Sequence, residues 1–242
     1  MIYFFDGTKA GFLTAFLQAF CDEHALVTSR ASQLRLGETS ITVITDEPRA
    51  NRVAERLLCF DKRCMRDLDY ILRAGEENNE QTAFAYLRVL ANAKRPVRDR
   101  FANEAVFAAN AVLKRVEFEI HRFHGFIRFT ECANGVLYAP FSPDNDICDL
   151  LVPHFRARFP NLPFLLHDIK RKKAAAYDGT HSFVLPLNRT DILLSEREYD
   201  YQALWKRYYE AVNIPSRARE RQMRGFMPVR YWQFLTEKQD ED

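Results

Sequence analysis

The stretch Gly125–Ala139, GFIRFTECANGVLYA, decides the fold because the spacing of apolar residues changes within it. Residues 125–131 and 136–139 read as strands, and they flank Asn134-Gly135, the strongest short-range signal of a β-hairpin. Before it, apolar residues recur every three or four positions over about 99–120, which predicts one long helix. The chain therefore passes from helix to antiparallel strands here, which is typical of an α+β protein.

Downstream, the sequence predicts more strands and then helices. Residues 164–169 read as a buried strand, and 174–177 with 182–187 read as a second hairpin around Asp178-Gly179. Asp144 is expected to cap a short helix that restarts at Pro153. Apolar residues at 201, 204, 205, 208 and 212 share one face of a tail helix, and Pro228 is expected to begin a last short helix.

Upstream, helices dominate and strands are short. Residues 2–5 read as an aromatic strand, Thr8 as the cap of a helix, and 40–45 as a second strand. Pro48 marks the start of further helices that stop before Pro96. We therefore expect an α+β fold with a helical N-terminal lobe over 1–95 and a central α+β core with C-terminal helices over 96–242, or one continuous domain.

Composition excludes several classes of protein. The net charge is only +2, so any attraction to phosphate must come from local clusters. The five cysteines form no C-x-x-C pair, which suggests free thiols in the cytoplasm and neither a zinc site nor an iron–sulfur cluster. We expect no signal peptide, no membrane span, no metal and no cofactor. There is no glycine-rich phosphate loop, no nucleophile elbow and no zinc-deaminase motif.

Four stretches resemble an uncharacterised family of intracellular bacterial proteins described as DNA-metabolism proteins. They are residues 3–7 with 11–14, residues 121–129, residues 153–171 and residues 226–232. The resemblance implies a companion role beside a radical-SAM protein of DNA modification or repair, and some related chains carry a uracil-DNA-glycosylase-like domain. This chain contains no C-x-x-x-C-x-x-C motif of its own.

Three segments combine basic and aromatic residues, as surfaces that bind single-stranded nucleic acid do. In the first, alternation along a strand would place Phe126 beside Arg128; alternatively, the phenylalanines are core and Arg128 pairs with a carboxylate. The second holds six basic residues and one acidic residue between positions 156 and 173, or is a solvated hairpin edge. The third is the arginine-rich tail over 215–232, which suits a protein interface equally well. Alternatively, this tail docks onto the core through Tyr231 and Trp232, and its arginines are solvated. The candidate nucleic-acid-binding residues are Arg122, Phe126, Arg128, Lys170, Arg171, Tyr177, Arg230, Tyr231 and Trp232.

One grouping has the residue types of an active site. His154, His167 and Asp168 provide two possible general acids or bases and a carboxylate. Neighbours on a strand point to opposite faces, so His167 and Asp168 cannot easily act as a dyad. The three could instead form a two-histidine, one-carboxylate metal set, or serve as polar groups satisfied at the edge of the core.

These observations favour a DNA-metabolism accessory protein that binds nucleic acid, single- or double-stranded, and cooperates with the radical-SAM protein. Two alternatives stay open. One is a nucleic-acid-processing enzyme that uses His154, His167 and Asp168. The other is a protein-interaction subunit that holds the radical-SAM partner without touching DNA.

Overall fold

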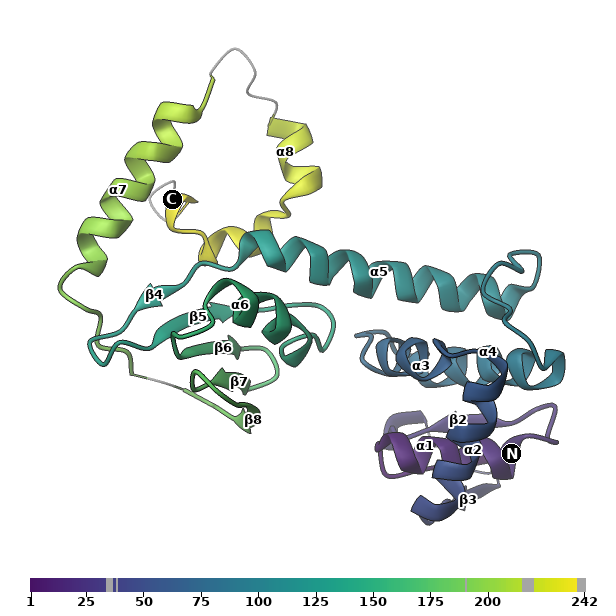
Figure 1. Cartoon of the computed structure of the whole chain (residues 1–242). Coiled ribbons are helices and arrows are strands. Elements are labelled where there is room, and N and C mark those ends of the chain that lie inside the picture. The colour runs from purple at the N-terminus through teal and green to yellow at the C-terminus, as the bar shows by residue number, and fades with distance from the viewer. Residues whose placement is uncertain (34–36, 38, 190, 215–219, 239–242) are drawn as a thin grey trace. The chain divides into compact units, whose positions relative to one another are not determined.

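The computed structural model describes residues 1–33, 37, 39–189, 191–214 and 220–238. These residues form two compact units, which we call unit 1 (1–117) and unit 2 (118–242). The mixed content of helices and two sheets confirms the α+β prediction (Figure 1). Within the described residues, no helix is both long enough and apolar enough to cross a membrane.

Unit 1 is built on a three-stranded parallel sheet in the order β2-β1-β3. Its strands are β1 (Ile2–Phe4), β2 (Leu26–Thr28) and β3 (Ser40–Thr42), with Tyr3 opposite both Val27 and Ile41. The strand β2 was not predicted, because three residues are too few for an alternation signal. The helices of unit 1 are α1 (Lys9–Ala19), α2 (Glu47–Phe60), α3 (Cys64–Leu72) and α4 (Asn79–Ala93), with a 3₁₀ turn η1 (Ala31–Gln33).

The first turns of these helices follow the sequence signals. Thr8 caps α1 by accepting a hydrogen bond from the Gly11 N–H at 2.9 Å, and Asp46 caps α2 in the same way. Asp6 lies beside α1, where its carboxylate accepts hydrogen bonds from Thr8 and Thr45, and these bonds lower its pKa. A Cβ atom on Gly11 would lie 2.1 Å from Asp6 Oδ1, so a side chain at this position would displace the Asp6 carboxylate from its hydrogen bonds.

The long helix differs from its predicted bounds. α5 runs from Glu104 to Phe126, and the division between the two units falls within it. The strand expected over 125–131 is therefore wrong at its start, since Gly125 and Phe126 are helical and β4 is only Thr130–Glu131. The expected alternation of Phe126 and Arg128 along one strand does not exist.

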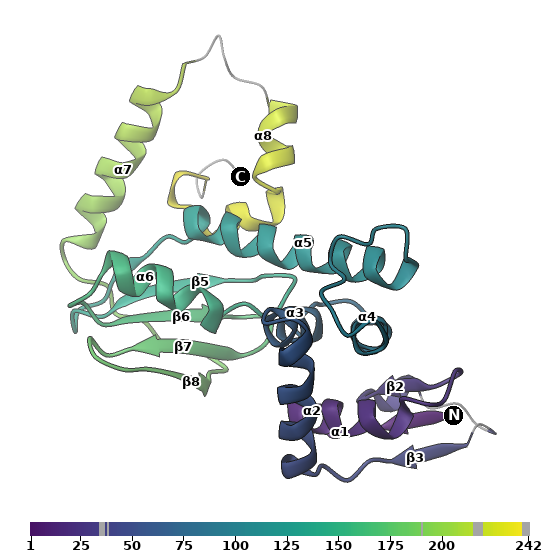
Figure 2. The ribbon, with the colours of Figure 1, turned by 45° about the vertical axis from the view of Figure 1, so that its right-hand side comes forward.

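Unit 2 contains a five-stranded mixed sheet in the order β4-β5-β6-β7-β8, of which Figure 2 labels β5 to β8. The other strands are β5 (Leu137–Phe141), β6 (Phe164–Asp168), β7 (Lys173–Tyr177) and β8 (Ser182–Pro186). Both predicted hairpins are present, β4–β5 and β7–β8. The first hairpin is connected to the rest of the sheet through the parallel pairing of β5 with β6, in which Ala139 lies opposite Leu166. The prediction of hairpins alone did not include this pairing.

One face of this sheet carries the aromatic core of unit 2. The ring of Phe123 from α5 packs on that of Phe141, with their centroids 5.1 Å apart. The ring of Phe155, which lies between β5 and β6 in the chain, packs against that of Phe164, with their centroids 6.4 Å apart. The C-terminal segment adds Tyr231, whose ring lies 4.8 Å from that of Phe123. Aromatic rings in such edge-to-face contacts bury large areas, which explains the phenylalanine-rich composition.

The remaining elements of unit 2 are helical. They are η2 (Asp149–Leu151), α6 (Val152–Arg158), α7 (Glu198–Val212), α8 (Glu220–Phe226), η4 (Val229–Phe234) and η5 (Thr236–Lys238). Asp144 does not cap a helix as expected, because the helical segment begins later and α6 begins with Pro153 in its first turn. The last predicted helix is the 3₁₀ segment η4, which follows Pro228.

Candidate nucleic-acid interface

The parallel pairing of β5 and β6 fixes the position of α6. Parallel neighbours cannot be joined by a tight turn, so the chain must cross back over the sheet between them. The helix α6 lies in this crossover, with Val152 and Phe155 buried toward the sheet. Its opposite face, which carries Pro153, His154, Arg156, Ala157 and Arg158, is exposed.

This exposed face carries only positive charge. From Leu150 to His167 the sequence contains no acidic residue. The guanidinium of Arg156 lies 5.6 Å from the ring centroid of Tyr177, and that of Arg158 lies 5.3 Å from the ring of Phe159. Within the described part of the chain neither arginine forms an ion pair, so both retain free N–H donors. Such donors suit phosphate oxygens.

Two histidine rings extend this face. His154 stacks on His124 of α5 with ring centroids 4.0 Å apart and an interplanar angle of 9°. Burial lowers the pKa of His124, and the nearby His154 and His121 lower it further. His124 is therefore neutral at pH 7, and the stacked pair presents a planar surface at the edge of α6.

A groove of about 470 Å³ adjoins the face, between α6 and the ends of β7 and β8. Tyr177 is buried there and its hydroxyl donates a hydrogen bond to the Pro160 carbonyl at 2.8 Å. This volume lies in the range of sites for small ligands. The residues lining the groove are Val152, Pro153, Arg156, Ala157, Pro160, Tyr177 and Ser182. We call these residues together with His124, His154 and Arg158 the α6 surface.

The basic cluster predicted between residues 156 and 173 is divided by the fold. Arg156 and Arg158 precede β6, whereas Lys170, Arg171 and Lys172 follow it, so the two groups lie at opposite edges of the sheet. Lys170 and Lys172 are exposed. Arg171 instead pairs with the buried Asp168 at 3.0 Å.

The edge at the carboxyl ends of β5 and β6 is an internally satisfied network. Arg171 donates from its side chain to the carbonyls of Pro143 and Asp144, which fixes the loop after β5. The buried Glu119 of α5 accepts hydrogen bonds from the backbone N–H of Asp144 at 2.8 Å and of Asn145 at 2.9 Å. We call this group the carboxyl edge.

Two tail candidates belong to the carboxyl edge. Tyr231 is buried, and its hydroxyl donates a hydrogen bond to Glu119 at 2.9 Å. Burial and the charge of Glu119 raise the pKa of Tyr231. Arg230 forms an ion pair with Asp144. Tyr231 and Tyr177 are thus core residues, and neither ring is available to stack on a base.

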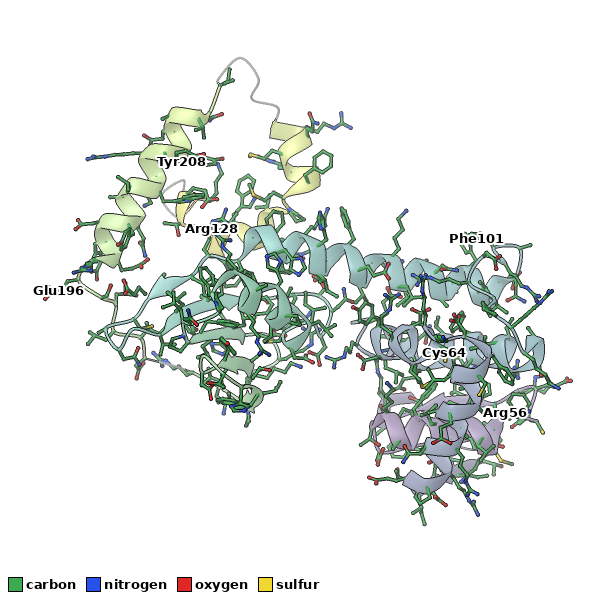
Figure 3. The ribbon with its side chains drawn as sticks, viewed as in Figure 1. Arg56, Cys64, Phe101, Arg128, Glu196 and Tyr208 are labelled. Atoms are coloured by element: carbon green, nitrogen blue, oxygen red, sulfur yellow. The ribbon has the colours of Figure 1, made fainter. Side chains whose placement is uncertain are left out.

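The other candidates hold the tail against the end of α5. Arg128, labelled in Figure 3, binds both carboxylate oxygens of Glu237, at 3.2 and 2.7 Å. Its guanidinium lies 5.3 Å from the centroid of the Trp205 ring. Arg128 therefore has the carboxylate partner that the alternative interpretation gave it. Arg122 donates to the Gly225 carbonyl at 3.0 Å.

The aromatic candidates of this region also make internal contacts. Phe126 lies 6.0 Å from the ring of Tyr231, and Trp232 donates its indole N–H to the Met227 carbonyl at 3.0 Å. Of the tail arginines, Arg217 and Arg219 lie outside the described residues.

The active-site candidates are not joined in the structure. His167 is buried. Its Nδ1 accepts a hydrogen bond from the Tyr138 hydroxyl at 2.7 Å, and its Nε2 donates one to the Leu187 carbonyl at 3.0 Å. Both ring nitrogens are thus occupied in the neutral form, because a carbonyl can only accept. Within the described residues, no hydrogen bond joins His154 to His167 or Asp168. The catalytic assignment stays a prediction without a geometric argument for it.

The metal alternative has no geometric support in the part of the chain that the structure describes. No three His, Cys, Asp or Glu side chains there lie close enough together to hold a metal ion. The carboxylate of Asp168 is taken by the side chain and backbone N–H of Arg171. His154, His167 and Asp168 therefore do not form the two-histidine, one-carboxylate set.

The sequence of the region that includes the α6 surface matches one known family. Residues 77–237, more than half of the chain, match the domain of unknown function DUF4130. The chain belongs to the DUF4130 family. The DUF4130 region comprises α4, α5 and unit 2 as far as η5. No curated protein and no solved structure matches the chain.

Sequence reasoning missed parts of the α6 surface of this DUF4130 chain. His124 was not among the candidates, although the spacing of His121 and His124 places both on one side of the end of α5. Ser182 and the prolines of the groove carry no local signal, because they meet only through the crossover and the second hairpin.

Proposed function

We propose that this chain is an accessory protein of DNA metabolism that binds nucleic acid through the α6 surface. The observation that carries the proposal is the combination of Arg156 and Arg158, both without a carboxylate partner in the described chain, with a groove large enough for one base. Arginines that pair internally hold the fold together, whereas unpaired, exposed arginines are available to a ligand.

The arrangement fits a single strand. The two guanidinium groups would each hold a phosphate of the strand, which fixes the strand but reads no sequence. The apolar groove wall of Val152, Pro153 and Pro160 would receive an unstacked base, and the stacked histidines would offer a second planar contact. A base within a duplex cannot enter such a groove, so single-stranded DNA is the favoured ligand.

The role beside a radical-SAM enzyme of DNA modification or repair is part of the same proposal. It is supported by the resemblance of the four sequence stretches to the family of DNA-metabolism proteins. Two of these stretches contain residues whose structural role is visible in the fold. Residues 3–7 with 11–14 contain the Asp6–Gly11 contact, and 153–171 contain the free arginines of α6 and the pair of Asp168 with Arg171. An accessory protein of this kind would hold the strand on which the enzyme acts.

The experiment measures fluorescence anisotropy of labelled single-stranded and double-stranded DNA with the full chain across a salt series. We expect tighter binding to the single strand and an affinity that falls steeply with salt. Arg156→Glu/Arg158→Glu should weaken binding by roughly tenfold or more, because it replaces two phosphate contacts with repulsion. The matched control is Lys170→Glu/Lys172→Glu, which makes the same charge change at the opposite edge of the sheet.

The outcomes separate cleanly. Loss of binding in the α6 variant alone supports the proposal. Equal loss in both variants indicates nonspecific attraction by net charge, and absence of binding at low salt overturns the proposal. Circular dichroism spectra that match those of the wild type confirm that each variant is folded.

A second candidate function is protein interaction alone, and α7 favours it. Tyr201, Leu204 and Tyr208 recur at helical spacing and are 57%, 63% and 58% exposed (Figure 3 labels Tyr208). A row of large exposed apolar side chains is typical of an interface. Leu204→Asp/Tyr208→Asp should abolish co-sedimentation with the purified radical-SAM protein if α7 holds it, without changing DNA binding. Unchanged co-sedimentation would remove α7 from consideration.

A further inference from the structure

Unit 1 contains a second hollow, unrelated to the α6 surface. It has a volume of about 400 Å³ and lies between α1 and α2, with Ala91 of α4 at its base. Its lining residues are Phe16, Leu17, Phe20, Arg49, Arg52, Val53, Arg56, Leu57, Phe60 and Ala91. We call it the α1–α2 groove. All of these residues except Ala91 precede the DUF4130 match.

The floor of the α1–α2 groove is apolar. Phe16 is buried and Leu57 is 2% exposed, so the floor is continuous with the core of unit 1. Val53, Leu57 and Phe60 recur at spacings of four and three, which places them along one side of α2. Leu17 stands at the rim and is 48% exposed. Covering such a surface with apolar side chains is favourable, because it removes apolar area from water.

The rim is cationic and has helical spacing. Arg49, Arg52 and Arg56 follow one another at intervals of one turn along α2, over roughly 10 Å at 1.5 Å per residue. Arg49 pairs with Asp46 at 3.1 Å, and Arg56 lies over the ring of Phe60 at 5.5 Å. For Arg52 and Arg56, no ion pair occurs with any other described residue. Figure 3 labels Arg56 on α2.

We propose that the α1–α2 groove binds an amphipathic helix of a partner protein whose flank carries acidic residues. A helix lying along α2 repeats its side chains at the same three- and four-residue spacing as the groove. Its apolar stripe would cover Val53, Leu57 and Phe60 while its carboxylates meet Arg52 and Arg56. A lipid chain, with one headgroup, matches a single arginine and leaves the rest of the row unused.

The experiment selects the partner chemistry directly from a displayed peptide library with the full chain as bait. Each peptide is an 18-residue helix with a fixed leucine stripe, and its flanking positions vary among Glu, Gln and Lys. We expect enrichment of Glu beside the stripe. Arg52→Glu/Arg56→Glu should reverse the preference and enrich Lys, because the change inverts the charge of the rim but leaves the floor intact.

Affinities of the best Glu-flanked peptide complete the test. Leu17→Asp, at the exposed rim, and Arg52→Glu/Arg56→Glu should each raise the Kd of this peptide by at least about tenfold. The control Arg95→Glu/Lys114→Glu makes the same charge change at exposed residues outside the groove and should leave the Kd unchanged. Enrichment of Gln or Lys with the wild-type chain, absence of any enrichment, or binding of anionic phospholipid vesicles in place of peptides would overturn the proposal.

Discussion

The carboxyl edge and the α6 surface lie on the same sheet and both contain arginines, yet these arginines have opposite surroundings. At the carboxyl edge, Arg171 and Arg230 have Asp168 and Asp144 as partners, and Glu119 is surrounded by donors. On α6, Arg156 and Arg158 lie over aromatic rings, and neither forms an ion pair with another residue that the structure describes. The difference teaches that a basic run in the sequence does not define a binding surface. An arginine is available to a ligand only where the fold places no carboxylate beside it.

The largest effect is expected at the carboxyl edge. Asp168→Ala leaves Arg171 without its carboxylate in a site where the arginine side chain is only 22% exposed. Breaking a buried ion pair costs about 3 kcal/mol, so unit 2 should unfold at markedly lower urea concentration. Because the chain has two units, the measurement must follow the transition of unit 2. Asp191→Ala, at an exposed position, is the control, and an equal loss in both variants would contradict this account.

The next largest effect is expected on α6 and concerns binding only. Arg156→Ala/Arg158→Ala should reduce the slope of log affinity against log salt by about two, since two phosphate contacts are lost. Its free energy of unfolding should stay within about 0.5 kcal/mol of the wild type, because neither arginine forms an ion pair with a described residue that the change would leave unpaired. A large loss of stability would show that these arginines resemble those of the carboxyl edge after all.

A smaller effect is expected where Arg128 holds the tail. Burial opposes the charge of Glu237, but hydrogen bonds from Arg128 and Trp205 outweigh it and lower the Glu237 pKa. Arg128→Lys replaces a bidentate contact with a point charge and should cost about 1 kcal/mol. The stabilisation by Glu237 is present above its ordinary pKa and is lost as pH falls through the lowered value. Fluorescence during acid titration measures both effects in a Trp232→Phe background, where Trp205 is the remaining tryptophan, with Arg197→Lys as control.

The smallest effect is expected at the stacked histidines. Because the pKa of His124 is lowered in the folded chain, the unfolded chain binds more protons below about pH 6.5. Stability should therefore decrease as pH falls from 7 to 5. His124→Phe keeps a ring in the stack and should flatten this dependence. His181→Gln, at an exposed position, should leave the pH dependence of stability unchanged. A steeper dependence in His124→Phe would rule out His124 as its source.

Local features of the fold were predictable from the sequence, whereas pairings between distant segments were not. Thr8, Pro48 and Asn134-Gly135 mark helix starts and a turn because their physical effect is confined to a few neighbours. The end of α5 was misjudged because Gly125 reads as a breaker, yet the last turn tolerates it. The parallel contact of β5 with β6 depends on a crossover that no short pattern encodes.

The candidate site shows the same limit. The basic run at 170–173 was visible in the sequence, but its division from Arg156 and Arg158 follows from the direction of β6. The partners of Arg128 and Tyr231 lie 109 and 112 residues away, so the sequence could not show that these side chains are occupied. The general alternative, an arginine paired with a carboxylate, was correct for Arg128 without naming Glu237.

The contact of Glu119 with Tyr231 also has a consequence for the order of folding. The crossover through α6 closes a short loop, but the tail must return over 112 residues to reach Glu119. During synthesis, the sheet of unit 2 can form while Tyr231 is still inside the ribosome, and the carboxylate of Glu119 then lacks one of its donors. Docking of the tail is thus the late step that completes unit 2, and a nascent chain arrested before residue 231 should remain sensitive to protease.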